Sequence, residues 1–207
     1  MQQPGDDEEL RDLRTELMPF AARYEERDTL RMHARELALR WLVKRDSLAA
    51  AMVEPVLASA GRDADAPMYE RLESAMLAMG DRHDRLELLY GLGQVRDPRL
   101  RERMLALTLD ARLGGREALY LLERALRSDD NRMAAFDFVR AHFDALVAKL
   151  PPDTPGELAT PLANLCSVPA RAAFADFFGE RSARFLGGPK RYREALESID
   201  LCIAARK

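Results

Sequence analysis

Apolar residues recur at spacings of three and four residues along almost the whole chain, and this pattern restricts the fold more than any other feature. Because an α-helix turns once every 3.6 residues, such spacing places the apolar side chains on one helix face. No segment alternates with a period of two for long enough to predict a strand. The chain is therefore predicted to be all-α. The longest stripe consists of Met133, Phe136, Val139, Phe143, Leu146 and Leu150.

The composition supports this prediction, because β-branched residues are too few to cover the faces of a sheet. The 207 residues include 7 Val, 2 Ile and 5 Thr. Hydrophobic residues make up 47% of the chain, which is enough for a sizeable core and argues against disorder. The net charge of −3 lacks the basic excess of nucleic-acid-binding proteins, so no nucleic-acid partner is expected.

Glycine, proline and capping residues divide the apolar stripes into helices. Asp97-Pro98, for example, combines an N-cap carboxylate with proline at the first helical position. About eleven helices are predicted, over residues 8–24, 28–45, 48–60, 66–79, 82–94, 98–110, 115–128, 131–150, 155–166, 169–179 and 189–206.

From Leu48 onward the predicted helices form antiparallel pairs of roughly thirty to forty residues, the period of stacked helical hairpins. This period predicts a superhelix, an α-solenoid of HEAT-like pairs, over residues 8–206 as a single domain. A compact bundle of the same helices is the alternative. Residues 1–7 are predicted to be a linker or disordered.

The two cysteines, Cys166 and Cys202, do not form a disulfide framework of the kind found in small secreted proteins, and we expect two half-buried thiols. The N-terminus is acidic where a signal peptide would be basic and then apolar. No apolar run approaches the roughly 20 residues that span a bilayer. We therefore expect a cytoplasmic protein without a membrane partner.

Motifs for catalysis are missing from the sequence. His33, His83 and His142 are about fifty residues apart, and none has a second histidine one helical turn away, as a zinc hydrolase requires. Gly91-Leu92-Gly93 lacks the remaining glycine and the preceding strand of a phosphate-binding loop. We therefore expect neither catalysis by this chain nor a cofactor in it.

Two basic clusters could bind carboxylates, because a guanidinium group grips a carboxylate bidentately. Arg96 and Arg99, in the first cluster, are the candidate substrate-binding residues. The alternative for both clusters is a solvated face with local ion pairs. The clusters consist of Arg96, Arg99, Arg101 and Arg103, and of Arg181, Arg184, Lys190, Arg191 and Arg193.

The segment from Asn131 to Leu146 is similar to a helix in the C-terminal domain of zinc aminopeptidases of the aminopeptidase N family. Phe136 and Phe143 stand where the family usually has tryptophan, and His142 where it has asparagine. The domain resembles more specifically the endoplasmic-reticulum-aminopeptidase-like subtype. The resemblance covers roughly residues 10–205, with further similar segments at 34–42, 90–100, 174–178 and 192–199.

The resemblance implies a helical domain that carries no catalytic or metal-binding residue. In the family, an upstream thermolysin-like domain holds the zinc through a His-Glu-x-x-His helix, and none of its motifs occurs here. The C-terminal domain closes over the catalytic domain and helps to form the cavity for the peptide substrate. At 207 residues the chain is expected to be a part of such an enzyme, because a complete one needs several further domains.

The leading hypothesis is therefore the non-catalytic C-terminal domain of a zinc aminopeptidase. Its expected partners are the catalytic domain of the same polypeptide and the peptide substrate. The alternative is a free-standing helical-repeat scaffold that binds a peptide or protein. A helical transcriptional repressor is disfavoured, because residues 1–26 are acidic where a DNA-binding helix-turn-helix would be basic.

Overall fold

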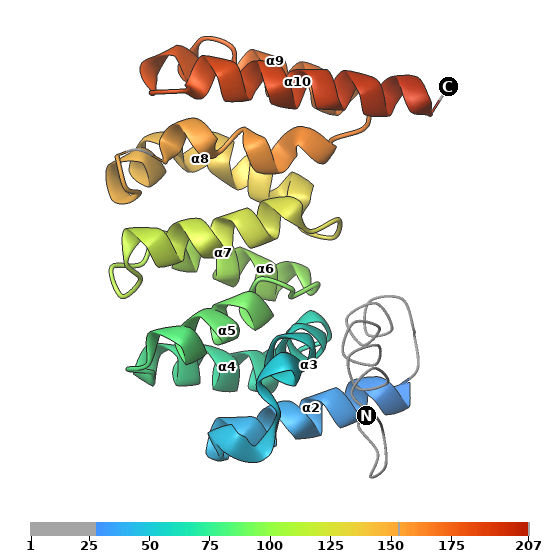
Figure 1. Cartoon of the computed structure of the whole chain (residues 1–207), viewed down its shortest axis with the longest axis vertical. Helices are drawn as coiled ribbons and strands as arrows, with labels where there is room; N and C mark the ends of the chain where they lie inside the picture. The colour runs from blue at the N-terminus through green and yellow to red at the C-terminus, as the bar shows by residue number, and fades with distance from the viewer. Residues whose placement is uncertain (1–27, 153, 207) are drawn as a thin grey trace. The chain divides into compact units, whose positions relative to one another are not determined.

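The computed structural model describes residues 28–152 and 154–206, and the regular elements in these ranges are all helices (Figure 1). The α-helices are α2 (Asp28–Val43), α3 (Ala50–Arg62), α4 (Ala66–Ala78), α5 (Arg82–Leu92), α6 (Pro98–Leu107), α7 (Gly115–Arg127), α8 (Arg132–Lys149), α9 (Val168–Phe178) and α10 (Gly188–Ala205). Short 3-10 helices are η1 (Arg45–Ser47), η2 (Pro155–Glu157), η3 (Thr160–Asn164) and η4 (Arg181–Arg184).

The all-α prediction is confirmed, and most predicted helices are present within a few residues of their expected bounds. The predicted linker 1–7 and helix 8–24 lie outside the described residues. None of the described helices combines the length and apolar character that a membrane span requires.

Several helices begin where a side chain accepts a hydrogen bond from the backbone N–H three residues later. Such caps satisfy a donor that the helix itself leaves without a partner. Pro98 is the first residue of α6, as its position after Asp97 predicts. The capping residues are Asp65 before α4, Asp81 before α5, Asp97 before α6 and Ser167 before α9.

The chain divides into two compact units, and the first extends to Met104. Within it α3 packs against α2 and α5, and α4 packs against α5. The backbones of α3 and α5 meet at Gly61 and Gly91. A Cβ atom at Gly61 would lie 1.9 Å from the carbonyl oxygen of Gly91, so only glycine fits at this crossing. The core of the unit includes Trp41, Leu57, Met68, Tyr69, Leu72, Met76, Leu88, Leu89 and Leu92, all buried.

The second unit begins at Leu105 and contains the pairs α7–α8 and α9–α10. The segment η3 packs against α7 and α10. A cluster of aromatic rings links α8 to α9. The ring of Phe136 lies 6.0 Å from that of Phe178, and Phe143 meets Phe177 edge-on at 5.3 Å. Phe136 and Phe143, from the longest apolar stripe, are buried, whereas Phe138 is only half-buried and lies against His142.

The predicted α-helix over residues 155–166 is wrong, because this segment forms the two short 3-10 helices η2 and η3. Pro155 and Pro161 each lack the N–H that a continuous helix would use, so each begins a new turn instead. Both prolines are buried at the N-terminal positions of these turns.

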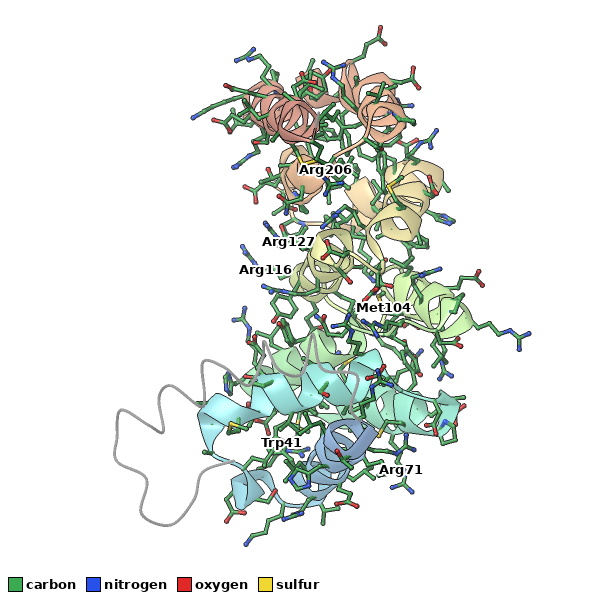
Figure 2. All side chains as sticks on the ribbon, turned by 90° about the vertical axis from the view of Figure 1, so that its right-hand side faces the viewer. Trp41, Arg71, Met104, Arg116, Arg127 and Arg206 are labelled. Carbon is green, nitrogen blue, oxygen red and sulfur yellow. A yellow bond between two sulfur atoms is a disulfide. The ribbon has the colours of Figure 1, made fainter. Side chains whose placement is uncertain are left out.

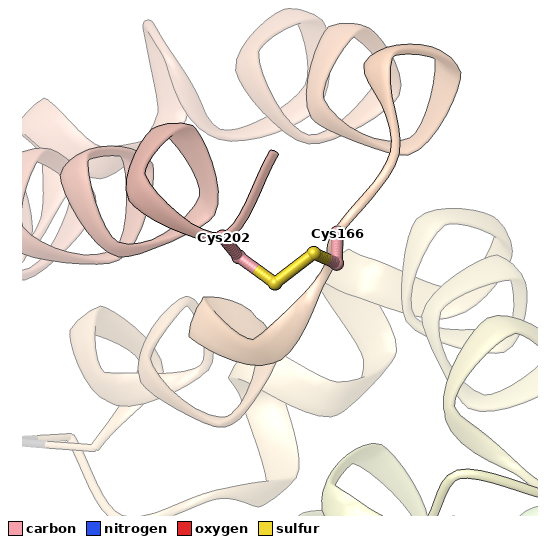
Figure 3. Close-up of a disulfide and its surroundings, with 2 residues drawn as sticks. All are labelled: Cys166 and Cys202. Atoms are coloured by element: carbon pink, nitrogen blue, oxygen red, sulfur yellow. A yellow bond between two sulfur atoms is a disulfide. The ribbon is translucent and has the colours of Figure 1, made fainter. Parts of the chain in front are cut away.

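The expectation of two free thiols is also wrong, because Cys166 and Cys202 form a disulfide (Figure 3). The two residues are 36 positions apart in the sequence, and their Cα atoms lie 5.3 Å apart. This separation is within the range that a disulfide can bridge. Packing of α10 against η3 brings the cysteines together, and no sequence spacing signals such a tertiary contact.

Candidate functional site

Arg96, a candidate substrate-binding residue, lies in the turn between α5 and α6 and is held by polar partners in the first unit. Its guanidinium Nη1 lies 3.8 Å from Oδ1 of Asp63, and its backbone N–H donates to the carbonyl oxygen of Arg62 at 3.2 Å. A ligand carboxylate at Arg96 would therefore compete with the carboxylate of Asp63.

Arg99, the other candidate, lies in the first turn of α6 and is exposed. Its backbone N–H donates to Oδ1 of Asp97 at 2.9 Å, which fixes the backbone at the start of the helix. The guanidinium group has no ion-pair partner among the described residues. Arg99 is thus more available to an added carboxylate than Arg96.

Arg103, in the second turn of α6, belongs to the same basic cluster and is itself exposed, but its guanidinium group contacts a nearly buried carboxylate. Its guanidinium group donates to Oε2 of Glu73, a residue that is only 7% exposed, and lies 5.2 Å from the centre of the Tyr69 ring. The hydrogen bond to Glu73 raises the pKa of Arg103. Arg103 therefore has a structural partner and joins α6 to α4.

Burial raises the pKa of the Tyr69 hydroxyl, and this hydroxyl has no hydrogen-bond partner among the described residues. This group of residues was not predicted from the sequence as a polar site. The signal was present, because Glu73 follows Tyr69 by four residues and therefore shares its buried face of α4.

The second basic cluster consists largely of local ion pairs, in line with the alternative stated for both clusters. Arg191 donates to Oε1 of Glu157 at 2.6 Å, and Lys190 lies 3.7 Å from Glu194. Arg181 donates to the backbone carbonyl of Phe177 at 2.9 Å. These contacts hold α10 and η4 in place, so the cluster is not a free basic patch.

The three histidines lie apart from one another on α2, α5 and α8. His83 and His142 are exposed, and His33 is half-buried beside Glu36 at 4.0 Å. In the ranges 28–152 and 154–206, no three His, Cys, Asp or Glu side chains gather as a group that could hold a metal ion.

A shallow groove of about 550 Å³ lies between α2 and α4 in the first unit. Val43, one of its lining residues, is 90% exposed, and Arg71, another, is labelled in Figure 2. Its lining mixes apolar with charged and polar side chains, which is a usual composition for a peptide or protein contact. Its lining consists of Leu39, Leu42, Val43, Pro67 and Ala75, together with Glu70, Arg71 and Ser74.

Two further arginines, which the sequence analysis did not single out, lie on one face of α7 in the second unit. Arg116 and Arg127 are exposed and point to the same side of this helix (Figure 2). Their spacing of eleven residues, close to three helical turns, was the available signal. Glu123 lies between them on this face, and its burial raises its pKa. Within the described part of the chain, neither guanidinium group forms a close ion pair, although the charge of Arg127 acts to lower the pKa of Glu123.

The sequence matches the family described as ERAP1-like C-terminal domain over residues 1–201. The chain therefore belongs to this family, the C-terminal helical domains of aminopeptidase N-type enzymes. No curated protein matches the chain significantly.

Proposed function

We propose that the chain closes over the catalytic domain of a zinc aminopeptidase and shapes the cavity that holds the peptide substrate. The family match over residues 1–201 carries this proposal. In this family context the zinc belongs to the catalytic domain, which would bind the metal and perform the hydrolysis. The chain described here would supply a surface that limits access and contacts the distal part of the peptide.

The side chains that we propose for peptide contact are exposed arginines without an ion-pair partner. Arg99 in the first unit and Arg116 and Arg127 in the second meet this criterion among the described residues. A guanidinium group of this kind can bind the carboxylate of a peptide bidentately. Arg96 is a weaker candidate, because Asp63 lies 3.8 Å from it.

We further propose that the helical pairs stack as an α-solenoid with HEAT-like pairs. Packing of α3 on α2, of α8 on α7 and of α10 on α9 supports this proposal within each unit. Small-angle X-ray scattering of the chain tests it. An extended stack gives a radius of gyration well above the roughly 17 Å expected for a compact domain of this length, and a value near 17 Å contradicts it.

The first functional test uses the purified chain with an aminoacyl fluorogenic substrate and a zinc assay. We expect no turnover and no stoichiometric zinc. Turnover together with stoichiometric zinc would show that the chain is itself a metallopeptidase, and the proposal would be wrong.

The second test determines whether a catalytic domain is the partner. The coding sequence upstream of Met1 is read for an in-frame His-Glu-x-x-His motif, and the longer protein is expressed with and without residues 1–207. Removal of these residues is expected to change the dependence of kcat/KM on peptide length more than kcat/KM for a single-aminoacyl substrate. Equal changes for both substrates would contradict a role in the peptide cavity. Lack of any upstream motif would favour the free-standing scaffold.

The third test addresses the arginines in the longer protein. Arg116→Ala and Arg127→Ala are expected to raise KM severalfold for long peptides with a free C-terminal carboxylate. KM for the same peptides with an amidated C-terminus should change less. Arg140→Ala is the control, because Arg140 is an exposed arginine already paired with Asp137 at 3.3 Å.

A further inference from the structure

The disulfide joins the C-terminal end of α10 to the segment between η3 and α9 (Figure 3). Cys202 lies in the last turns of α10, three residues before the helix ends at Ala205. Cys166 lies two residues after the end of η3. The bond therefore fixes the end of a helix to a neighbouring irregular segment.

The N-terminal two-thirds of α10 is held by contacts that do not involve the disulfide. The ring of Tyr192 stacks on that of Phe174 in α9 at 5.7 Å. Arg191 forms an ion pair with Glu157 at 2.6 Å, and Ala195 and Ile199 are buried. These contacts would keep the helix docked up to Ile199 if the disulfide were opened.

The last turns of α10 have few such contacts. From Asp200 to Arg206 no side chain is buried, and Leu201 is 65% exposed. Asp200 pairs with Arg171 of α9, but both side chains are well exposed, and such a pair contributes little to stability. Because α10 also packs against η3, the disulfide adds a covalent connection between this end of the helix and the segment that follows η3.

Both cysteine residues are only half-buried, so the disulfide lies near the surface of the unit. Exposed disulfides are the ones that exchange with thiols most readily, and cytosolic dithiol systems reduce them. Thiol–disulfide exchange would therefore interconvert an oxidised and a reduced form of the chain.

We propose that Cys166–Cys202 is a reversible thiol–disulfide latch that docks residues 200–206 when oxidised and releases them when a dithiol reduces it. One thiolate of the dithiol attacks a sulfur atom of the bond, forming a mixed disulfide and freeing the other cysteine. The second thiolate of the dithiol then displaces the remaining cysteine. The dithiol becomes a cyclic disulfide, and the chain gains two electrons and two protons as two thiols.

Hydrogen exchange of the folded chain, with and without dithiothreitol in the absence of denaturant, tests the latch. We expect dithiothreitol to release two thiols per chain. Exchange in peptides covering residues 200–206 should become at least tenfold faster. Exchange in peptides covering residues 188–198 should accelerate much less than in residues 200–206, because the contacts of Tyr192, Ala195 and Ile199 remain.

Two variants sharpen the test. The double variant Cys166→Ser/Cys202→Ser should exchange like the reduced chain and should not respond to dithiothreitol. Asp200→Asn in the oxidised chain removes the ion pair with Arg171 and should change exchange at residues 200–206 less than threefold. Unreactive sulfur atoms in the folded chain would overturn the proposal. So would equal acceleration along all of α10, or unchanged exchange after reduction.

Discussion

Gly61 and Gly91 show how single residues set the distance between two helices. At both positions the neighbouring backbone occupies the space of a side chain, so α3 and α5 approach closely. A Cβ atom at Gly91 would lie 2.9 Å from the carbonyl oxygen of Leu57. A backbone cannot move aside as the end of a flexible side chain can, and a larger residue must therefore separate the two helices.

Gly61→Ala is expected to lower the free energy of unfolding by about 3 kcal/mol, because the added methyl group overlaps the backbone of α5. Urea denaturation measures this loss. Gly80→Ala is the matched control, because a Cβ atom at Gly80 meets no atom within 4 Å, and its effect should stay below about 0.5 kcal/mol. A loss below about 1 kcal/mol for Gly61→Ala would contradict the close crossing.

Asp65 caps the N-terminus of α4 and also forms an ion pair with Arg35. Its carboxylate accepts hydrogen bonds from Nη1 of Arg35 and from the backbone N–H of Met68, each at 2.9 Å. The hydrogen bond from Arg35 is the larger cause, and that from Met68 the second, of the lowered pKa of Asp65. The folded state thus favours the ionised form.

Asp65→Ala is expected to cost about 1 kcal/mol at pH 7 through the loss of the cap. Because the folded pKa is lowered, the charged group stabilises the fold above its ordinary pKa of 3.8, and this contribution disappears as the pH falls through the folded pKa. The stability difference between the wild type and Asp65→Ala should therefore shrink below pH 4. Asp65→Asn keeps a capping oxygen, so its free energy of unfolding at pH 7 should fall less than that of Asp65→Ala. A difference that is constant from pH 7 to pH 2 would contradict the role of the charge.

At the scale of elements, the pair of Arg103 and Glu73 joins α6 to α4. Glu73 is nearly buried, so its carboxylate depends on Arg103 for a charged partner. Breaking a buried pair on one side leaves a charge without a partner, which costs more than the intact pair contributes.

Arg103→Ala is expected to lower the free energy of unfolding by about 2 kcal/mol, less than for a fully buried pair because Arg103 itself is 44% exposed. Arg140→Ala is a close control. Arg140 is also 44% exposed and also lies over an aromatic ring, but its partner Asp137 is well exposed. Arg140→Ala should lower the free energy of unfolding by less than about 1 kcal/mol. Equal losses in thermal or urea unfolding would show that burial of Glu73 is unimportant.

The sequence predicted most helices because their ends carry local signals. Asp65, Asp81 and Asp97 are caps whose partners are three residues away, and such contacts are visible in the sequence. The segment after Leu150 has no such pattern. Its apolar residues suggested a helix, whereas Pro155 and Pro161 interrupt the backbone hydrogen bonds and leave two 3-10 turns.

The candidate site was less predictable, because its properties depend on contacts between elements. The sequence placed Arg96 and Arg103 in one basic cluster, but Asp63 and Glu73 come from other helices to meet them. The cysteine pair depends in the same way on how α10 packs against η3. Local periodicity contains no information on such distant partners.

At the scale of the whole molecule, the two compact units contain different kinds of constraint. The first has the close glycine crossing, and the second has the covalent bond between Cys166 and Cys202. A cross-link over 36 positions reduces the conformational entropy of the unfolded chain and thereby stabilises the folded one.

Cys166→Ser/Cys202→Ser is expected to lower the free energy of unfolding by about 3–4 kcal/mol relative to the oxidised chain. Because the sites lie in different units, this loss should add to that of Gly61→Ala within about 0.5 kcal/mol. Urea denaturation of the single and combined variants, all without reductant, measures both quantities. A strongly non-additive combination would show that the two sites are coupled.

The disulfide also determines whether the fragments of a proteolytically cut chain stay joined. The covalent loop that it closes contains Leu186, which is 93% exposed, beside Gly187, which has a positive φ of 74°. A protease that cuts at this exposed turn would leave both fragments joined through sulfur. The nicked protein would migrate as an intact chain on a non-reducing gel and separate into two pieces only after reduction.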